Sequence, residues 1–235
     1  MEFDKRKALF VTAFLVLALA AYQIQFSMII GAPAKSFSLF EFLGPIGSQL
    51  FSIPLGVASV LIVEAVNFIV SGQTVTAINI ARFLPMVFAA VYFGIDFAKN
   101  KNSVSSKAML LMPIACMALF IANPEGQGAW FYSLFWAIPV IVAVWFNENL
   151  VARSLGATFT AHAVGSVAFL YAFNIPTATW AMLVPITTVE RGLFALGIAA
   201  SVVVFSTALD AAENKVHWKV PLHYDAKYSL LKTTV

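Results

Sequence analysis

The chain has 235 residues, of which 61% are hydrophobic and 11% are charged, and its mean hydropathy is +0.88. A soluble globular domain carries about 25% charged residues, so this composition excludes a water-soluble protein and indicates a polytopic integral membrane protein. The net charge of +3 is small and spread over short polar segments, which argues against nucleic-acid binding.

The first apolar segment, residues 8–30, follows a basic N-terminus. It is longer than the roughly 7 to 15 apolar residues at the centre of a secretory signal peptide. We therefore expect a retained first transmembrane helix over this segment.

The second apolar segment, residues 38–70, is too long for one straight crossing, which needs about 20 residues. It is interrupted by Gly44, Pro45, Pro54 and Gly56. We expect it to enter the membrane, turn at Pro54 and Gly56, and return, either as two short crossings or as a re-entrant pair.

The later apolar blocks are separated by short polar connectors and cover residues 80–98, 108–122, 130–146, 156–173 and 178–209. Their apolar runs are continuous, whereas the strands of a membrane barrel alternate between lipid-facing and lumen-facing residues. The predicted fold class is therefore all-α, a transmembrane helical bundle of about eight crossings (six to eight). Residues 1–209 are expected to form the bundle and residues 210–235 a solvated cytoplasmic tail.

The positive-inside rule predicts the orientation from the basic residues of the short segments. These residues are Lys5, Arg6, Lys7, Lys99, Lys101, Lys107, Arg153, Lys215, Lys219, Lys227 and Lys232. If residues 38–70 cross twice, all of them lie in the cytoplasm with both termini, and Lys35 is the basic residue left in a clear external loop. A single crossing would instead place Lys99, Lys101 and Lys107 outside, so the double crossing is favoured.

Charged and polar residues within the apolar blocks are candidate functional groups, because a charge near the bilayer centre costs about 2.5 to 3.5 kcal/mol on insertion scales and normally faces a partner or a cavity. Glu64 and Asn67 lie one helical turn apart, so both point to one face of the third crossing. Glu190 and Arg191 are adjacent, so they point about 100° apart and should reach different helices. Arg82, at the start of the fourth crossing, is a candidate partner for Glu64 or Glu190. Structural ion pairs, contacts with partner subunits and substrate binding all remain open for these residues.

His162 lies among small residues between positions 156 and 166, a composition that permits close approach of another helix. We expect a hydrogen-bonded packing residue rather than a metal ligand, and neither a metal nor another cofactor is predicted. Trp180 follows an external connector, and two readings stay open for it: an interfacial or packing residue, or a ring that stacks on a bound aromatic ligand. The single cysteine, Cys116, cannot form an intrachain disulfide.

The sequence contains no nucleophile elbow, nucleotide-binding loop, dinucleotide fingerprint or His-Glu-x-x-His zinc motif. We therefore expect a protein that is not an enzyme and has no ATPase of its own. An intramembrane enzyme acting on lipid stays open as a third reading, for which Glu64, Glu190 and His162 would supply the acid and base groups.

Three stretches, residues 42–47, 55–69 and 79–94, resemble the substrate-binding S components of energy-coupling factor transporters. They share a short second helix that ends in a Gly/Pro turn, a third helix rich in small residues with a polar residue near its end, and a fourth helix. Residues 184–195 are similar to the last helix of many of these proteins. The resemblance implies a membrane protein that binds a vitamin or related micronutrient externally and associates with a coupling subunit and paired ATPases.

The leading hypothesis is a multi-pass cell-membrane subunit that binds a small organic micronutrient for uptake energised by partner ATPases. The ligand would enter near residues 71–79 and 174–180. Its expected contacts are Glu64, Asn67, Asn79, Arg82, Trp180, Glu190 and Arg191. The alternative is a non-catalytic structural subunit of a larger membrane complex, in which the same charges pair across subunit interfaces. The predicted partners are the small-molecule substrate, membrane lipids, other membrane subunits and ATPases, and no nucleic acid.

Overall fold

The computed structural model describes residues 5–28, 36–97, 99–100, 103–215 and 220–231, and nearly all of its regular structure is α-helical. Five helical segments are long and apolar enough to cross a membrane. They are α4 (Ile53–Val70), the pair α5 (Ala77–Ala81) and α6 (Leu84–Gly94), α7 (Val104–Ala122), α10 (Leu150–Phe173) and α11 (Thr177–Asn214). The predicted all-α class is confirmed, as is the expectation of apolar helices of membrane-spanning length.

The N-terminal helix is shorter than predicted. α1 (Lys5–Tyr22) ends well before residue 30, and β1 (Gln25–Met28) then pairs antiparallel with β2 (Ser36–Ser38). Polar and apolar side chains alternate from Gln23 to Met28, which is the period of a strand rather than of a helix. The prediction of one helix over residues 8–30 is therefore wrong beyond Tyr22.

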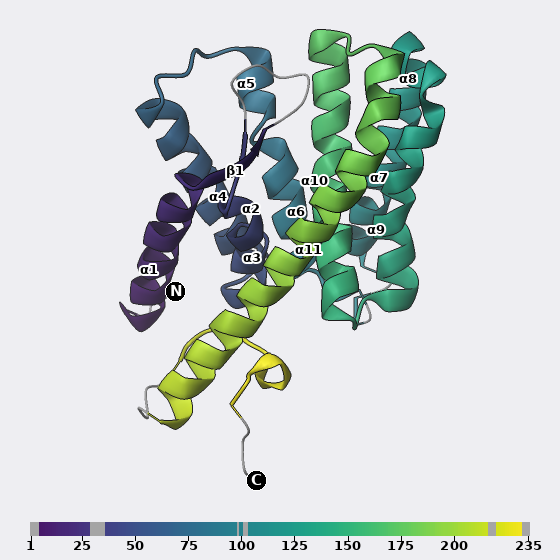
Figure 1. The fold of residues 1–235 in the computed structure, drawn as a ribbon. Helices are drawn as coiled ribbons and strands as arrows, with labels where there is room; N and C mark the ends of the chain where they lie inside the picture. The colour runs from purple at the N-terminus through teal and green to yellow at the C-terminus, as the bar shows by residue number, and fades with distance from the viewer. Residues whose placement is uncertain (1–4, 29–35, 98, 101–102, 216–219, 232–235) are drawn as a thin grey trace.

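The segment 38–70 is not one continuous helix. Its first part forms two short helices, α2 (Phe40–Leu43) and α3 (Ile46–Leu50), after which the chain turns at Phe51 and Ser52 and enters α4. At a rise of about 1.5 Å per residue, neither α2 nor α3 is long enough to cross a bilayer. Figure 1 shows α2 and α3 lying within the bundle beside α4.

The turn in this segment lies before the predicted position at Pro54 and Gly56. Pro54 instead occupies the first turn of α4, where a missing backbone N–H removes no helical hydrogen bond. Gly56 lies inside α4 and contacts α3 so closely that a Cβ atom would overlap the backbone of Ser48. Gly56 therefore serves close packing of the two helices rather than the turn.

The block 130–146 is also less regular than predicted. After α8 (Pro124–Gly128), it forms a 3-10 helix, η1 (Trp130–Trp136), then α9 (Ala137–Ile141) and a π-helical turn, η2 (Val142–Phe146). Its backbone is held to α6 by Tyr92, whose hydroxyl donates to the Pro139 carbonyl oxygen at 2.7 Å.

Small residues of α10 allow the close helix contact expected from the sequence. α10 packs against both α6 and α11. At Gly156 a Cβ atom would overlap the Tyr92 ring of α6, and at Gly165 it would reach ordinary van der Waals contact with Pro85. The small side chains thus set how near α6 lies to α10.

The two ends of the bundle carry different connectors. In Figure 1 the start of α1, the link from α6 to α7 and the far end of α11 lie toward one end, whereas the β-hairpin, α5 and α8 lie toward the other. The link from α6 to α7 therefore lies at the same end as the basic start of α1. Four basic residues of the orientation argument, Lys35, Lys101, Lys219 and Lys232, lie outside the described residues.

The described part of the C-terminal segment packs on the bundle. α11 continues to Asn214, past the boundary expected at residue 209. Further on, the His223 backbone N–H donates to the Leu50 carbonyl at 2.9 Å, and the Ser229 hydroxyl donates to Asp210 Oδ2 at 2.6 Å. Residues 220–231 therefore contact the bundle while staying partly exposed.

Candidate functional site

A partly open cavity of about 160 Å³ lies between the β-hairpin and the helices of the bundle. Side chains from α1, β2, α2, α4, α5, α6, η1, α10 and α11 line it. Most of the predicted ligand contacts are among them, namely Glu64, Asn79, Arg82, Trp180, Glu190 and Arg191. Residues from widely separated parts of the chain thus converge on one space.

Asn67 is the predicted contact that does not line this cavity. Its amide is used in packing: Oδ1 accepts from Gln23 Nε2 at 2.7 Å, and Nδ2 donates to the Val63 carbonyl at 2.8 Å. Glu64, one turn earlier, also faces the end of α1, where Tyr22 donates its hydroxyl to Glu64 Oε2 at 3.4 Å. The two residues share a face, as predicted, but only Glu64 reaches the cavity.

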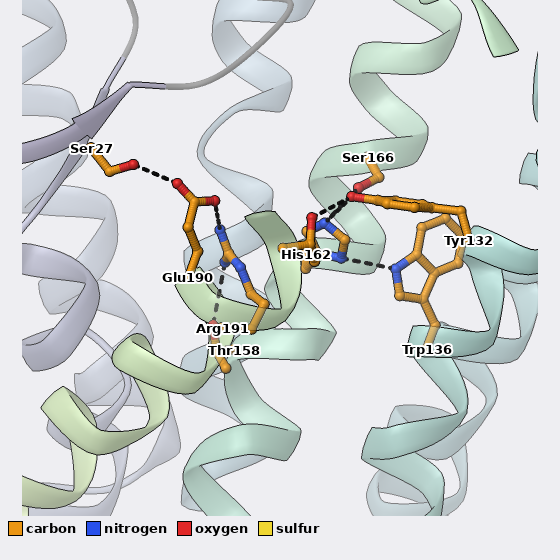
Figure 2. Close-up of polar contacts among 9 residues, drawn as sticks. Ser27, Tyr132, Trp136, Thr158, His162, Ser166, Glu190 and Arg191 are labelled. Atoms are coloured by element: carbon orange, nitrogen blue, oxygen red, sulfur yellow. Dashed lines mark hydrogen bonds and ion pairs between the residues drawn. The ribbon is translucent and has the colours of Figure 1, made fainter. Parts of the chain in front are cut away.

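Glu190 and Arg191 reach different elements, as Figure 2 shows. Glu190 accepts a hydrogen bond from Ser27 of β1, and Arg191 Nη1 donates to Thr158 Oγ1 of α10 at 3.3 Å. Their own ion pair is long, with 4.0 Å between Arg191 Nη2 and Glu190 Oε2. The prediction that these neighbours do not simply neutralise each other fits this geometry.

Arg191 is almost completely buried, with 3% of its surface exposed. Its guanidinium lies over the rings of Phe37 and Phe194, at 4.8 and 4.3 Å from their centroids, which is the geometry of cation–π contacts. Its Nε has no hydrogen-bond partner among the described residues. The side chain is therefore anchored mainly by aromatic rings and keeps an unused donor.

Arg82 does not form the predicted ion pair. Its Nη1 donates to Gln73 Oε1 at 3.4 Å, and within the described residues neither Glu64 nor Glu190 lies within 4.0 Å of its guanidinium. Arg82 does lie within electrostatic range of Glu64 and of Glu41, a cavity residue of α2. The charges at this side of the cavity interact across space without direct contact.

His162 is held by three neighbours (Figure 2). The Trp136 indole N–H donates to Nδ1 at 3.1 Å, while Nε2 lies 3.0 Å from the Tyr132 hydroxyl and 3.3 Å from Ser166 Oγ. An indole N–H can only donate, so Nδ1 must be the acceptor, and the neutral ring carries its proton on Nε2. Nε2–H then donates to an oxygen, and the Tyr132 hydroxyl continues the chain to Thr187 at 2.7 Å.

This network fits the predicted packing role of His162, since both ring nitrogens are engaged. The histidine also lines the cavity, which the sequence did not indicate. Within the part of the chain that the structure describes, no group of three or more His, Cys, Asp or Glu residues is arranged to hold a metal ion.

Trp180 forms part of an aromatic wall. Its indole N–H donates to the Ile175 carbonyl at 3.0 Å, and its ring lies 5.0 Å from the rings of both Phe120 and Tyr132. These contacts fix the ring, and its remaining surface lines the cavity. The side chain is thus rigid, and with 2% of its surface exposed it offers a ligand little area for stacking.

Sequence reasoning overlooked several polar cavity residues, among them Glu41, Tyr22 and Tyr132. Glu41 had a recognisable sign, because it is a carboxylate within the apolar block 38–70, like Glu64. Glu64, Glu190 and His162, the groups considered for acid–base chemistry on lipid, all line the same cavity.

Comparisons with known proteins return no match: no family model matches the chain, and neither do curated proteins or solved structures.

Proposed function

We propose that the chain is a multi-pass cell-membrane subunit that binds a small organic micronutrient for uptake, with transport energised by partner ATPases. One observation carries the proposal: Glu64, Asn79, Arg82, Trp180, Glu190 and Arg191, chosen from the sequence, line a single cavity. Polar groups converging on a cavity with aromatic walls are typical of small-molecule sites.

The position of the cavity supports uptake from outside. Its lining includes Gln73 and Asn79 beside one predicted external connector and Ile175 and Trp180 beside another. In the proposed topology, with eight membrane segments and both termini in the cytoplasm, this end of the bundle faces outward. The ligand would then enter beside the β-hairpin and α5.

Partner ATPases are part of the proposal because the sequence has no nucleotide-binding motif. Substrate capture and energy supply would be divided between subunits, as in the S components that the sequence resembles. Transport would consist of a change in the orientation or gating of this subunit, driven by ATP hydrolysis elsewhere.

The test is purification of the tagged protein in mild detergent from its native membrane, followed by native mass spectrometry and identification of co-purifying proteins. We expect a bound small organic molecule together with nucleotide-hydrolysing subunits. Glu64→Gln should lose the bound mass because it removes a cavity carboxylate. Glu148→Gln is the matched control, because it removes an exposed carboxylate that does not line the cavity.

The rival function, a structural subunit, predicts a different result. In that case the purified assembly has fixed stoichiometry with redox or synthetic subunits and carries no small molecule, in the wild type as in Glu64→Gln and Glu148→Gln. That outcome would refute substrate binding.

A further inference from the structure

The charges that line the cavity do not balance. It contains the carboxylates of Glu41, Glu64 and Glu190 and the guanidiniums of Arg82 and Arg191. When all five are ionised, one negative charge is in excess. A charge removed from water is costly unless it is compensated, so this excess favours a positively charged occupant.

The excess lies on the side of the cavity formed by α2 and α4. Arg191 is paired with Glu190, although at 4.0 Å. Arg82 lies within electrostatic range of both Glu41 and Glu64, and Arg191 lies within range of Glu41 as well as of Glu190, so two cations are shared by three carboxylates. Among the described residues, Glu64 accepts a single hydrogen bond, from Tyr22, and Glu41 makes neither a hydrogen bond nor an ion pair. Both carboxylates therefore have acceptor capacity left for a ligand.

The walls of the cavity are suited to an aromatic ring. They include six aromatic side chains besides Tyr22, namely Phe37, Phe68, Phe83, Tyr132, Phe169 and Trp180. Phe37 already lies under a cation, the guanidinium of Arg191 at 4.8 Å. Such faces attract planar cations by stacking and by the ring quadrupole.

Arg191, at the edge of the charged side of the cavity, also carries a buried donor without a partner. Arg191 lines the cavity, is 3% exposed and has no partner for Nε among the described residues. A buried polar group of this kind is normally hydrogen-bonded in a native protein.

The size of the cavity limits what the ligand can be. Its volume of about 160 Å³ is close to the roughly 150 Å³ of an engineered protein cavity that binds benzene. One ring fills such a space, and any substituent must extend toward the open side.

We propose that the cavity binds a small single-ring aromatic cation, with its positive end against Glu41 and Glu64 and its ring between the aromatic walls. This inference rests on the proposed function and names its substrate class. The carboxylates of Glu41 and Glu64 select the ligand by its charge at one side of the cavity. Stacking on the aromatic rings holds the ligand at the other side.

The experiment uses three planar probes of nearly equal shape, namely benzamidinium, benzamide and benzoate, which carry a positive, no and a negative charge. Their binding to the full-length protein in detergent is measured by isothermal titration calorimetry at neutral pH. We expect benzamidinium to bind at least about tenfold more tightly than benzamide, and benzoate to bind most weakly. The double variant Glu41→Gln, Glu64→Gln should bring the ratio for benzamidinium and benzamide close to one.

Glu148→Gln is the matched control because Glu148 is exposed and does not line this cavity, so the preference should persist. Tighter binding of benzamide or benzoate would overturn the cation inference, as would an unchanged preference in the double variant. Binding of none of the three probes would also overturn it. In each case, native mass spectrometry of the purified protein decides separately whether the cavity holds another small molecule, so substrate binding can survive when the cation does not.

Discussion

At the scale of single residues, Arg191 is the side chain whose loss should disturb the fold most. It is buried, lies over two phenylalanine rings and is the cation nearest to Glu190. Arg191→Ala should lower the free energy of unfolding by about 3 kcal/mol, because it removes the ring contacts and leaves Glu190 without its cation. Thermal unfolding in detergent measures the change.

The control for this prediction is Lys107→Ala, which removes an exposed cation and should change the unfolding free energy by less than about 0.5 kcal/mol. Equal stability of the Arg191 and Lys107 variants would show that the buried guanidinium contributes nothing to the fold.

Glu125 lies outside the membrane-spanning helices, and its carboxyl group should make the stability of the fold depend on pH. Its carboxylate accepts from the Thr177 backbone N–H at 2.7 Å and from the Thr177 hydroxyl at 2.8 Å, and these hydrogen bonds lower its pKa below the ordinary value of 4.5. A carboxyl group whose pKa is lower in the folded than in the unfolded state stabilises the fold at pH values above its ordinary pKa. This stabilisation is lost as the pH falls through the folded-state pKa.

The measurement compares the thermal unfolding midpoints of the wild type and Glu125→Gln between pH 7 and pH 3. We expect the wild type to have the higher midpoint at pH 7, and the difference to shrink below about pH 4.5 because the wild-type carboxyl then becomes protonated. A difference that stays constant across this range would contradict the role of Glu125.

The sequence predicted individual cavity residues better than their partners. Glu64, Arg82, Glu190 and Arg191 were found because charge within an apolar block is unusual, and a cavity accounts for their positions. Their contacts could not be predicted, since pairing depends on distances between helices far apart in the chain. Arg82, for example, contacts Gln73 rather than either expected carboxylate.

At the scale of elements, the contact between α3 and α4 should tolerate almost no added volume. A Cβ at Gly56 would overlap the backbone of Ser48, so Gly56→Ala must separate the two helices. We expect a loss of about 2 kcal/mol in the free energy of unfolding, which is typical of overpacking. Denaturant or thermal unfolding in detergent measures it.

Gly192→Ala is the matched control in α11, where a Cβ atom would meet nothing within 4 Å. This substitution should stabilise the helix by up to about 1 kcal/mol, because alanine has the higher helix propensity. A Gly56→Ala variant as stable as the wild type would mean that α3 and α4 are not in close contact.

The same elements show what the pattern of apolar residues can predict. The length and the Gly/Pro content of residues 38–70 correctly indicated a broken segment. The position of the break was wrong because proline and glycine each have two structural uses: Pro54 begins a helix and Gly56 permits close packing. The β-hairpin was overlooked because its strands are only four and three residues long, and the alternation from Gln23 to Met28 directly follows the apolar run of α1.

At the scale of the whole molecule, the orientation of the bundle can be tested by cysteine labelling. In a Cys116→Ala background, Thr74→Cys should react with a membrane-impermeant maleimide in intact cells, because Thr74 is exposed beside the outer end of α4 in the proposed topology. Lys99→Cys, exposed in the link between α6 and α7, should react only after the membrane is permeabilised.

The opposite pattern, with Lys99→Cys labelled from outside, would reverse the bundle and place the cavity opening toward the cytoplasm. Reaction of both positions in intact cells would contradict a defined topology. Either result would remove the argument for uptake from outside while leaving the helical fold unchanged.

The central claim is that the polar cavity holds a small molecule. A cryo-electron microscopy map of the complex purified from its native membrane tests it most directly. We predict non-protein density between Glu64, Arg82 and Trp180, with no neighbouring polypeptide in the cavity. A map in which side chains of another subunit contact Glu64 and Arg82, and in which no ligand density lies beside Trp180, would contradict the claim.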